Sequence, residues 1–167
     1  LGSVGLSGAR WLWTLGGGGT SLGPRVRGLL DTMPLGEFLR DQLQVEGIAM
    51  NVAEQRLHAL ALTATRYATG QTVTFVHGSP GTPAWERVRR CGRHTKINVA
   101  HVMASGAIPL IFPAIRIDGE YYGDGSIRQA APLAPAIHLG AERLLAVATR
   151  YSPTLEEVRA RATAGYP

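Results

Sequence analysis

A chain of 167 residues, 45% hydrophobic and with a mean hydropathy of +0.02, has the composition of one globular domain. It has no apolar run near the ~20 residues that a membrane-spanning helix needs, and its start lacks the pattern of a secretory signal. The net charge of +5 comes almost wholly from arginine, but no nucleic-acid-binding motif accompanies it, so we expect no nucleic-acid partner. The single cysteine, Cys91, excludes an internal disulfide and fits a reducing compartment, so we expect a cytoplasmic protein.

The first 27 residues are predicted to form a weak helix, residues 3–15, followed by a glycine-rich loop, residues 16–27. The loop contains Gly19-Thr20-Ser21-Leu22-Gly23, which matches G-x-S-x-G, a motif that exposes a nucleophilic serine between a strand and a helix. No predicted strand precedes this match, and no long helix follows it. Ser21 is therefore an alternative nucleophile and not the first choice.

Helical and strand patterns alternate through the middle of the chain. Helices are predicted at residues 32–44, 48–55, 84–90 and 98–107, and strands at residues 57–66 and 71–77. Thr32 is expected to cap the first of these helices. The strand at 57–66 is almost continuously apolar, which predicts that both of its faces are covered, whereas the strand at 71–77 alternates.

The predicted helix at 84–90 is basic and carries Trp85. A cluster of positive charges runs through and beyond it: Arg87, Arg89, Arg90, Arg93 and Lys96. The cluster has two interpretations, a solvated face or a surface that attracts anionic lipid headgroups. Trp85 likewise fits either a lipid interface or a half-buried anchor.

The C-terminal third is centred on an acidic residue between two glycines. Asp118-Gly119 predicts a tight hairpin between strands at residues 114–117 and 120–122, and the second strand delivers Asp124 at its end. Gly123 and Gly125 are expected to give the backbone unusual freedom and to leave the carboxylate open. Such an acid is either a turn residue or a catalytic group. A helix at 132–139 ending at Gly140, a strand at 143–149 and a helix at 154–164 complete the chain.

Strands that alternate with helices predict an α/β fold, a sheet sandwiched by helices. Three histidines, His94, His101 and His138, lack the spacing of metal ligands, so we expect no metal site and no cofactor. Ser105 is interpreted as a small packing residue and not as a nucleophile.

Several of these segments, in order, resemble the C-terminal part of a patatin-like phospholipase domain of the bacterial type. They are the Leu-Leu-Asp-Thr run at 29–32, the run ALALTAT at 59–65, SGAIPLIFPAIRIDGEYYGDGS and APLAPAIHLGAERLLAVA. The resemblance is strongest over residues 28–150. It implies that residues 1–167 are one partial domain, a patatin-like α/β sheet incomplete at its N-terminus.

In that family an aspartate in an Asp-Gly-Gly or Asp-Gly-Ala motif is one half of a Ser-Asp dyad. The resemblance therefore implies that Asp124 is the general base, with Gly123, Gly125 and Ser126 as its motif; Ser126 stands where the family has Gly or Ala. The full-length protein would be a lipid acyl hydrolase (phospholipase or esterase) acting on lipid or phospholipid esters without a cofactor, in peripheral contact with a membrane surface.

The resemblance also implies that the nucleophilic serine and the oxyanion-stabilising glycine loop precede residue 1. The chain by itself is then expected to be inactive and to fold poorly, because sheet edges and apolar faces would be uncovered. Two alternatives remain: a catalytically inactive fragment with a membrane-surface or interaction role, and a serine hydrolase that uses Ser21 with Asp124.

Overall fold

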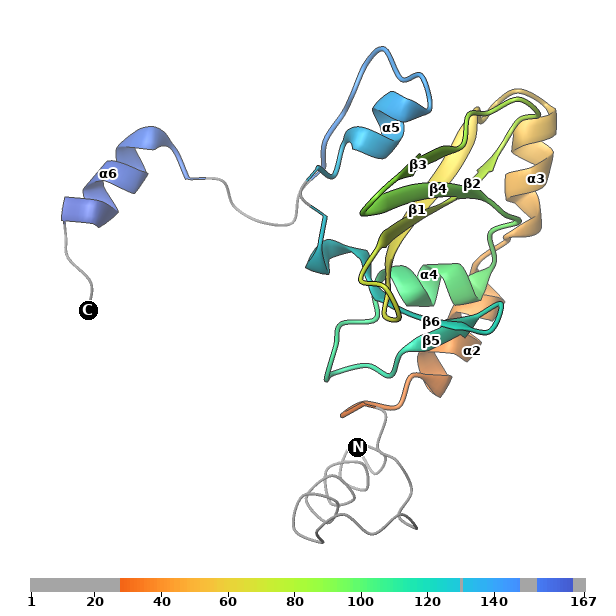
Figure 1. Cartoon of the computed structure of the whole chain (residues 1–167), viewed down its shortest axis with the longest axis horizontal. Helices are drawn as coiled ribbons and strands as arrows, with labels where there is room; N and C mark the ends of the chain where they lie inside the picture. The colour runs from red at the N-terminus through yellow and green to blue at the C-terminus, as the bar shows by residue number, and fades with distance from the viewer. Residues whose placement is uncertain (1–27, 130, 148–152, 164–167) are drawn as a thin grey trace, which may run out of the picture.

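The computed structural model describes residues 28–129, 131–147 and 153–163 (Figure 1). The predicted helix at 3–15, the loop at 16–27 and Ser21 lie outside these residues. Among the helices that the structure describes, none has the length and apolarity to cross a membrane.

A six-stranded open sheet forms the centre of the molecule, with the strand order β3-β4-β2-β1-β6-β5. The strands are β1 (Ala59–Arg66), β2 (Thr72–Gly78), β3 (Trp85–Arg87), β4 (Arg90–His94), β5 (Ile115–Ile117) and β6 (Glu120–Asp124). Only β2 and β4 pair in parallel; the other neighbours are antiparallel. This mixed sheet with its helices confirms the predicted α/β class.

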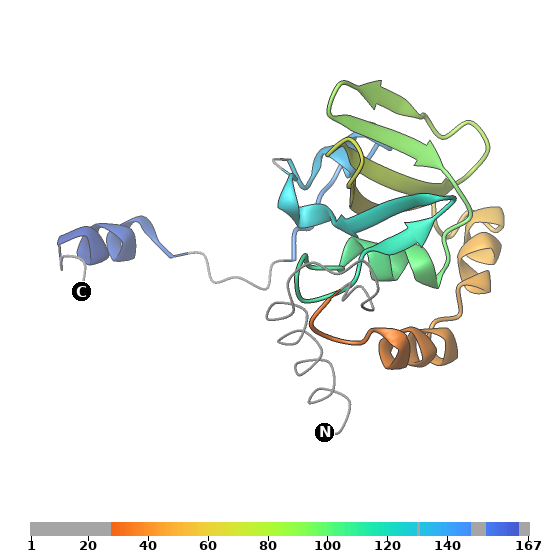
Figure 2. The same ribbon diagram turned by 60° about the horizontal axis from the view of Figure 1, so that its bottom comes forward.

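Helix α4 lies against one side of the sheet and α5 lies on the other (Figures 1 and 2). The bounds of the described helices are α2 (Met33–Gln42), α3 (Glu46–Ala53), α4 (Val99–Ser105), α5 (Ala134–His138) and α6 (Leu155–Thr163); a short 3₁₀ turn, η1, spans Gly125–Ile127. These positions confirm the helices predicted at 32–44, 48–55, 98–107, 132–139 and 154–164. One detail is wrong: the Thr32 side chain makes no capping bond, and the Met33 amide instead donates to Asp31 Oδ1 at 2.9 Å.

The prediction of a basic helix at 84–90 is wrong, because this segment forms the β3–β4 hairpin. Trp85 pairs with Gly92, which has no side chain in the space that the indole occupies. The indole also stacks on the His138 ring of α5, with ring centroids 4.9 Å apart. Residues 90–94 are held in a parallel ladder with residues 72–76 of β2. These long-range partners outweigh the local helical spacing of charges.

Two predictions about strands are also corrected. Strand β2, and not β1, is covered on both faces: Thr72 to Val76 are all buried, whereas most of β1 is half-buried. The predicted strand at 143–149 is absent over its described part, residues 143–147, where Leu145 and Val147 are 90% and 89% exposed. A strand needs a neighbour for its backbone hydrogen bonds, and the described sheet offers this segment none.

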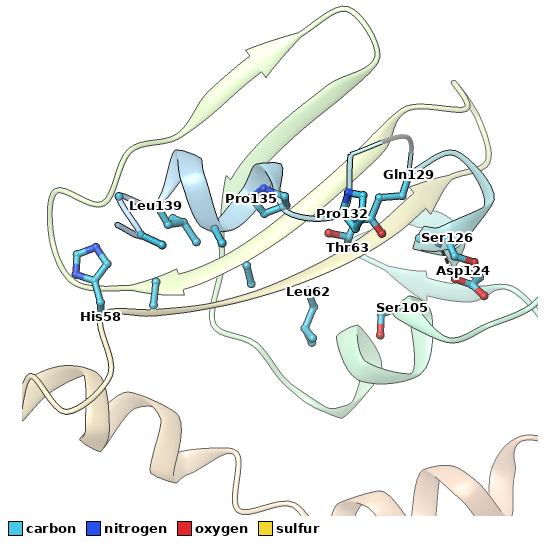
Figure 3. Close-up of a pocket in the computed structure, with 16 residues that line it drawn as sticks. His58, Leu62, Thr63, Ser105, Asp124, Ser126, Gln129, Pro132, Pro135 and Leu139 are labelled. Carbon is cyan, nitrogen blue, oxygen red and sulfur yellow. Dashed lines mark hydrogen bonds between the residues drawn. The ribbon is translucent and has the colours of Figure 1, made fainter. Parts of the chain in front are cut away.

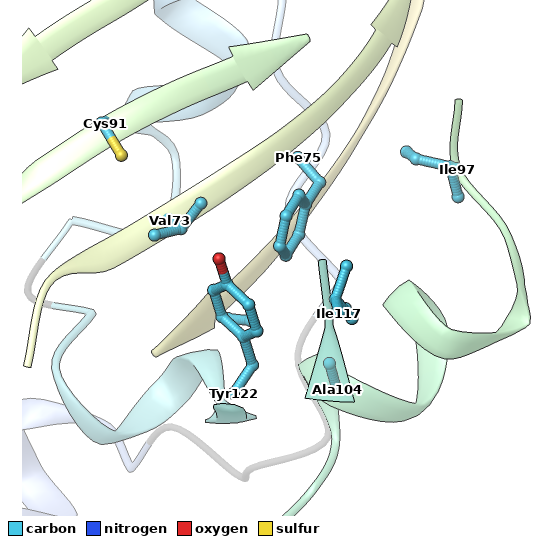
Figure 4. Packing of buried hydrophobic residues seen from close by; sticks show 8 residues of the cluster. Val73, Phe75, Cys91, Ile97, Ala104, Ile117 and Tyr122 are labelled. Carbon is cyan, nitrogen blue, oxygen red and sulfur yellow. The ribbon is translucent and has the colours of Figure 1, made fainter. Parts of the chain in front are cut away.

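The core lies between the sheet and α4 (Figure 4). Its buried members are Ala64, Val73, Phe75, Cys91, Ile97, Ala104, Ile117 and Tyr122. The Phe75 ring forms T-shaped contacts with the rings of His101 and Tyr122, with centroids 4.6 and 5.2 Å away. Burial raises the pKa of the Cys91 thiol, which keeps it protonated and agrees with its interpretation as a packing residue.

Candidate active site

Asp124 is positioned by a hairpin and by two neighbouring elements. Asp118 and Gly119 both have positive φ, 49° and 86°, as the predicted two-residue turn requires. The antiparallel pairing of β6 with β1 places Asp124 opposite Ala64. The Asp124 amide donates to the Ala107 carbonyl at 2.9 Å, just after α4, and its carbonyl accepts from Thr65 Oγ1 at 2.9 Å. The main chain of Asp124 is thus fixed from both sides.

The Asp124 carboxylate has one oriented oxygen. Oδ1 accepts from the Ser126 amide at 2.7 Å, a bond that also opens η1, while Oδ2 accepts no hydrogen bond from the described residues (Figure 3). The side chain is half-buried. A carboxylate held through one oxygen, with the other uncommitted, is able to accept a proton from a hydroxyl brought within hydrogen-bond reach.

Gly123 and Gly125 serve close packing and not backbone freedom, so that part of the sequence interpretation is wrong. Neither has a positive φ. A side chain at Gly125 would collide with the Thr63 carbonyl of β1, and one at Gly123 would collide with the Tyr67 hydroxyl. The glycines therefore let β6 and η1 approach β1 and Tyr67 closely enough to hold Asp124 in place.

Tyr67 is a neighbour of Asp124 that the sequence interpretation missed. The pKa of its hydroxyl is raised, first by burial and second by the negative charge of Asp124. No sequence motif marks Tyr67, since it simply follows β1 at a turn. Only the pairing of β1 with β6 brings Tyr67 against Gly123, the residue before Asp124.

A cavity of about 730 Å³ opens beside Asp124, within the range of ligand-binding pockets. Its walls come from β1, η1, the end of α4 and α5. The lining residues are His58, Ala59, Ala61, Leu62, Thr63, Ser105, Asp124, Gly125, Ser126, Gln129, Pro132, Pro135, Ala136, Leu139, Gly140 and Ala141. Asp124 and Ser126 lie at one end and His58 at the other, with mostly apolar side chains between them (Figure 3).

The backbone of β1 is open along this cavity. The Tyr67 amide donates toward β6, to Tyr121, and the Arg66 amide donates toward β2, to Gln71. Because backbone groups alternate along a strand, those of Ala59 and Ala61 point to the β6 side. Strand β6 pairs with residues 64–66 of β1, so within the described residues no strand covers Ala59 and Ala61. This edge is able to accept an extended segment.

The other candidates have local partners. Ser105 lines the cavity, but its hydroxyl donates to the Val102 carbonyl at 2.8 Å. His101 joins the N-terminal cap of α4, His94 Nε2 lies 2.7 Å from the Thr82 carbonyl, and His138 stacks on Trp85. In the part of the chain that the structure describes, no three His, Cys, Asp or Glu side chains gather as a metal site would need.

Comparison with known protein families places this geometry in context. A sequence model of patatin-like phospholipases matches residues 10–137, which include Asp124 and the strands around it. Comparison with curated proteins, and with solved structures, found no match.

Proposed function

This chain belongs to the patatin-like phospholipase family, and from that membership we propose that Asp124 is the general base of a lipid acyl hydrolase. The family supports a lipid hydrolase activity in general; the role of Asp124 is our assignment. The observation that carries it is the Asp124 carboxylate at the end of an apolar cavity, with Oδ1 held by the Ser126 amide and Oδ2 uncommitted.

The proposed reaction is a two-step ester hydrolysis. A serine hydroxyl attacks the acyl carbonyl as its proton passes to Asp124, and the proton then goes to the departing alcohol. Asp124 next takes a proton from water, which attacks the acyl-serine; Asp124 then returns this proton to the departing serine oxygen, so that the fatty acid is released and both residues are restored. Each backbone amide directed at the oxyanion contributes a few kcal/mol. The apolar lining between Asp124 and His58 suits a substrate acyl chain, so the substrate class is a lipid or phospholipid ester.

We propose that the serine comes from a segment outside residues 28–163, one that precedes residue 1 and has an extended strand directly before its serine. Two observations support this. The Ser105 hydroxyl donates a hydrogen bond to the Val102 carbonyl, and the uncovered edge of β1 at Ala59 and Ala61 ends beside Asp124. A strand paired there would bring a following serine to the carboxylate. The chain by itself is then inactive. Ser21 is the competing nucleophile.

A fluorophosphonate probe distinguishes these sources, because it labels only an activated serine. We expect no labelling of the 167-residue chain, and labelling in the added segment when the polypeptide is extended upstream in its reading frame. Labelling at Ser21 would transfer the nucleophile to that residue. An upstream sequence without a strand followed by G-x-S-x-G would refute the proposed source of the serine.

The dyad assignment is tested in the extended polypeptide by Asp124→Asn, which keeps an oxygen for the Ser126 amide but removes the base. Ester hydrolysis should fall about 10²- to 10⁴-fold without a change in thermal stability. Asp118→Asn is the matched control: it makes the same change in the same hairpin, and Asn-Gly forms the same turn. Retained turnover in Asp124→Asn would exclude this residue as the base.

A further inference from the structure

The β3–β4 hairpin presents a concentrated positive charge at one edge of the sheet. Arg87 pairs with Arg90, so Val88 and Arg89 form its two-residue tip. Strand β3 is the outermost strand on this side of the sheet, opposite β5 (Figure 2). Val88 is 96% exposed, and the three arginines around it are exposed as well. The tip therefore places one fully exposed apolar side chain among three positive charges.

The positive cluster seen in the sequence does not form one surface, since Lys96 lies beyond the end of β4 and the four arginines divide into two groups. Arg93 faces the core side of the sheet and lies 3.5 Å from Glu120. Within the described residues, no carboxylate forms an ion pair with Arg87, Arg89 or Arg90. These three charges at the tip are thus available to an external anion.

The hairpin shares a face of the sheet with the Asp124 cavity. Arg87 and Arg90 line a narrow cavity together with Trp85 and His138. Three further residues, Thr63, Gln129 and Pro135, line both this cavity and the one at Asp124. Helix α5 lies over the same face (Figure 3); Ile137 within it is 60% exposed, and Leu133 just before it is 42% exposed.

We propose that the β3–β4 hairpin docks on an anionic lipid surface, with Val88 at the headgroup boundary and Arg87, Arg89 and Arg90 on lipid phosphates or carboxylates. This inference rests on the proposed lipid hydrolase function, since docking would turn the face with the Asp124 cavity toward the substrate. Each arginine near an anionic membrane strengthens binding about fivefold. Single-stranded nucleic acid fits less well, because it needs aromatic faces for stacking and the Trp85 ring is occupied by His138.

The test is flotation of the full chain with vesicles of phosphatidylcholine alone or with added phosphatidylserine. Lipid-bound protein floats, whereas aggregates sink. We expect binding only to the phosphatidylserine vesicles, and release by salt. The triple variant Arg87→Gln, Arg89→Gln, Arg90→Gln should lose about 100-fold in binding. The control Arg40→Gln, Arg116→Gln, Arg143→Gln removes the same charge from exposed sites elsewhere and should lose less than about fivefold.

A second variant gives a gain of signal. Val88→Trp should bind more tightly than the parent chain and shift its fluorescence to the blue on phosphatidylserine vesicles, because an indole suits the headgroup zone. Equal losses in the two triple variants, or no blue shift, would overturn the proposal. So would hairpin-dependent binding to an RNA oligonucleotide without binding to vesicles. Asp124→Asn should bind vesicles as the parent does, which separates a failure of docking from a failure of the dyad.

Discussion

Gly125 sits where η1 crosses the backbone of β1, and its missing side chain decides how closely the two approach. We expect Gly125→Ala to lower the free energy of unfolding by about 2 kcal/mol, because a methyl group would press on the Thr63 carbonyl. Urea unfolding followed by circular dichroism measures the loss. Gly47→Ala in α3 is the control: its added carbon meets only Asn51, 4.0 Å away, and helical alanine gains about 0.5–1 kcal/mol over glycine. Unchanged stability in Gly125→Ala would show that the close approach is not needed.

His101 is a buried titratable group on α4. The backbone amide of Asn98 donates to His101 Nδ1 at 3.1 Å, and His101 Nε2 has no hydrogen-bond partner among the described residues. Burial lowers the pKa of His101 below its ordinary value of 6.5, against a smaller opposing effect of the Asp118 charge. The neutral imidazole is therefore the form that the folded chain stabilises.

This shift makes stability depend on pH in a definite direction. As pH falls below 6.5, the unfolded chain binds a proton at His101 before the folded chain does. The stability that the neutral His101 side chain contributes is fully present above pH 6.5. It is lost as the pH falls toward the lower pKa of the folded state, by at most about 1.4 kcal/mol per pH unit. Comparing unfolding free energies of the parent and His101→Gln across this range isolates the effect. Parallel curves for the two proteins would contradict it.

At the scale of elements, α4 depends on a side-chain cap whereas α2 does not. Asn98 Oδ1 accepts from the Ala100 amide at 3.0 Å, and Asn98 and His101 cap each other reciprocally. We expect Asn98→Ala to cost about 1 kcal/mol in urea unfolding. Thr32→Ala is the matched control and should be nearly neutral, since Thr32 makes no capping bond. Equal losses in both variants would mean that the capping bonds of Asn98 add nothing.

The whole molecule leaves interaction surfaces uncovered within its described part. The edge of β1 is open, and several large apolar side chains are more than half exposed: Met33, Phe38, Met50, Leu110 and Ile137. We expect the isolated chain to self-associate and to bind a hydrophobic dye. Sedimentation velocity measures the association. A monomer with a cooperative thermal transition would contradict this expectation.

Proline at neighbouring positions of β1 tests whether the open edge is responsible. The Ala61 amide points away from β2, so Ala61→Pro removes a donor from the open edge and should reduce self-association. The Leu62 amide points toward β2, so Leu62→Pro should break the β1–β2 ladder and unfold the chain. If Ala61→Pro associates as the parent does, the exposed apolar side chains and not the strand edge drive association.

Much of the local structure of this protein could be predicted from the sequence alone. Helical periodicity located α2 and α4, Asp118-Gly119 located the hairpin, and the hairpin fixed Asp124 at the end of a strand. The order of these motifs also identified the family, which the match over residues 10–137 confirms. The helices and the hairpin depend on residues close together in the chain, so pattern and propensity are sufficient to predict them, whereas the family was identified by resemblance to known sequences.

Tertiary structure decided the rest, because the deciding partners are far apart in the sequence. Trp85 to Arg90 became a hairpin and not a helix since β2 offered residues 90–94 a ladder and Gly92 offered the indole space. Gly123 and Gly125 proved to be packing residues because Tyr67 and Thr63 lie against them. The cavity beside Asp124 likewise exists only where β1, η1 and α5 meet, and such contacts form by burial and strand pairing that no local pattern encodes.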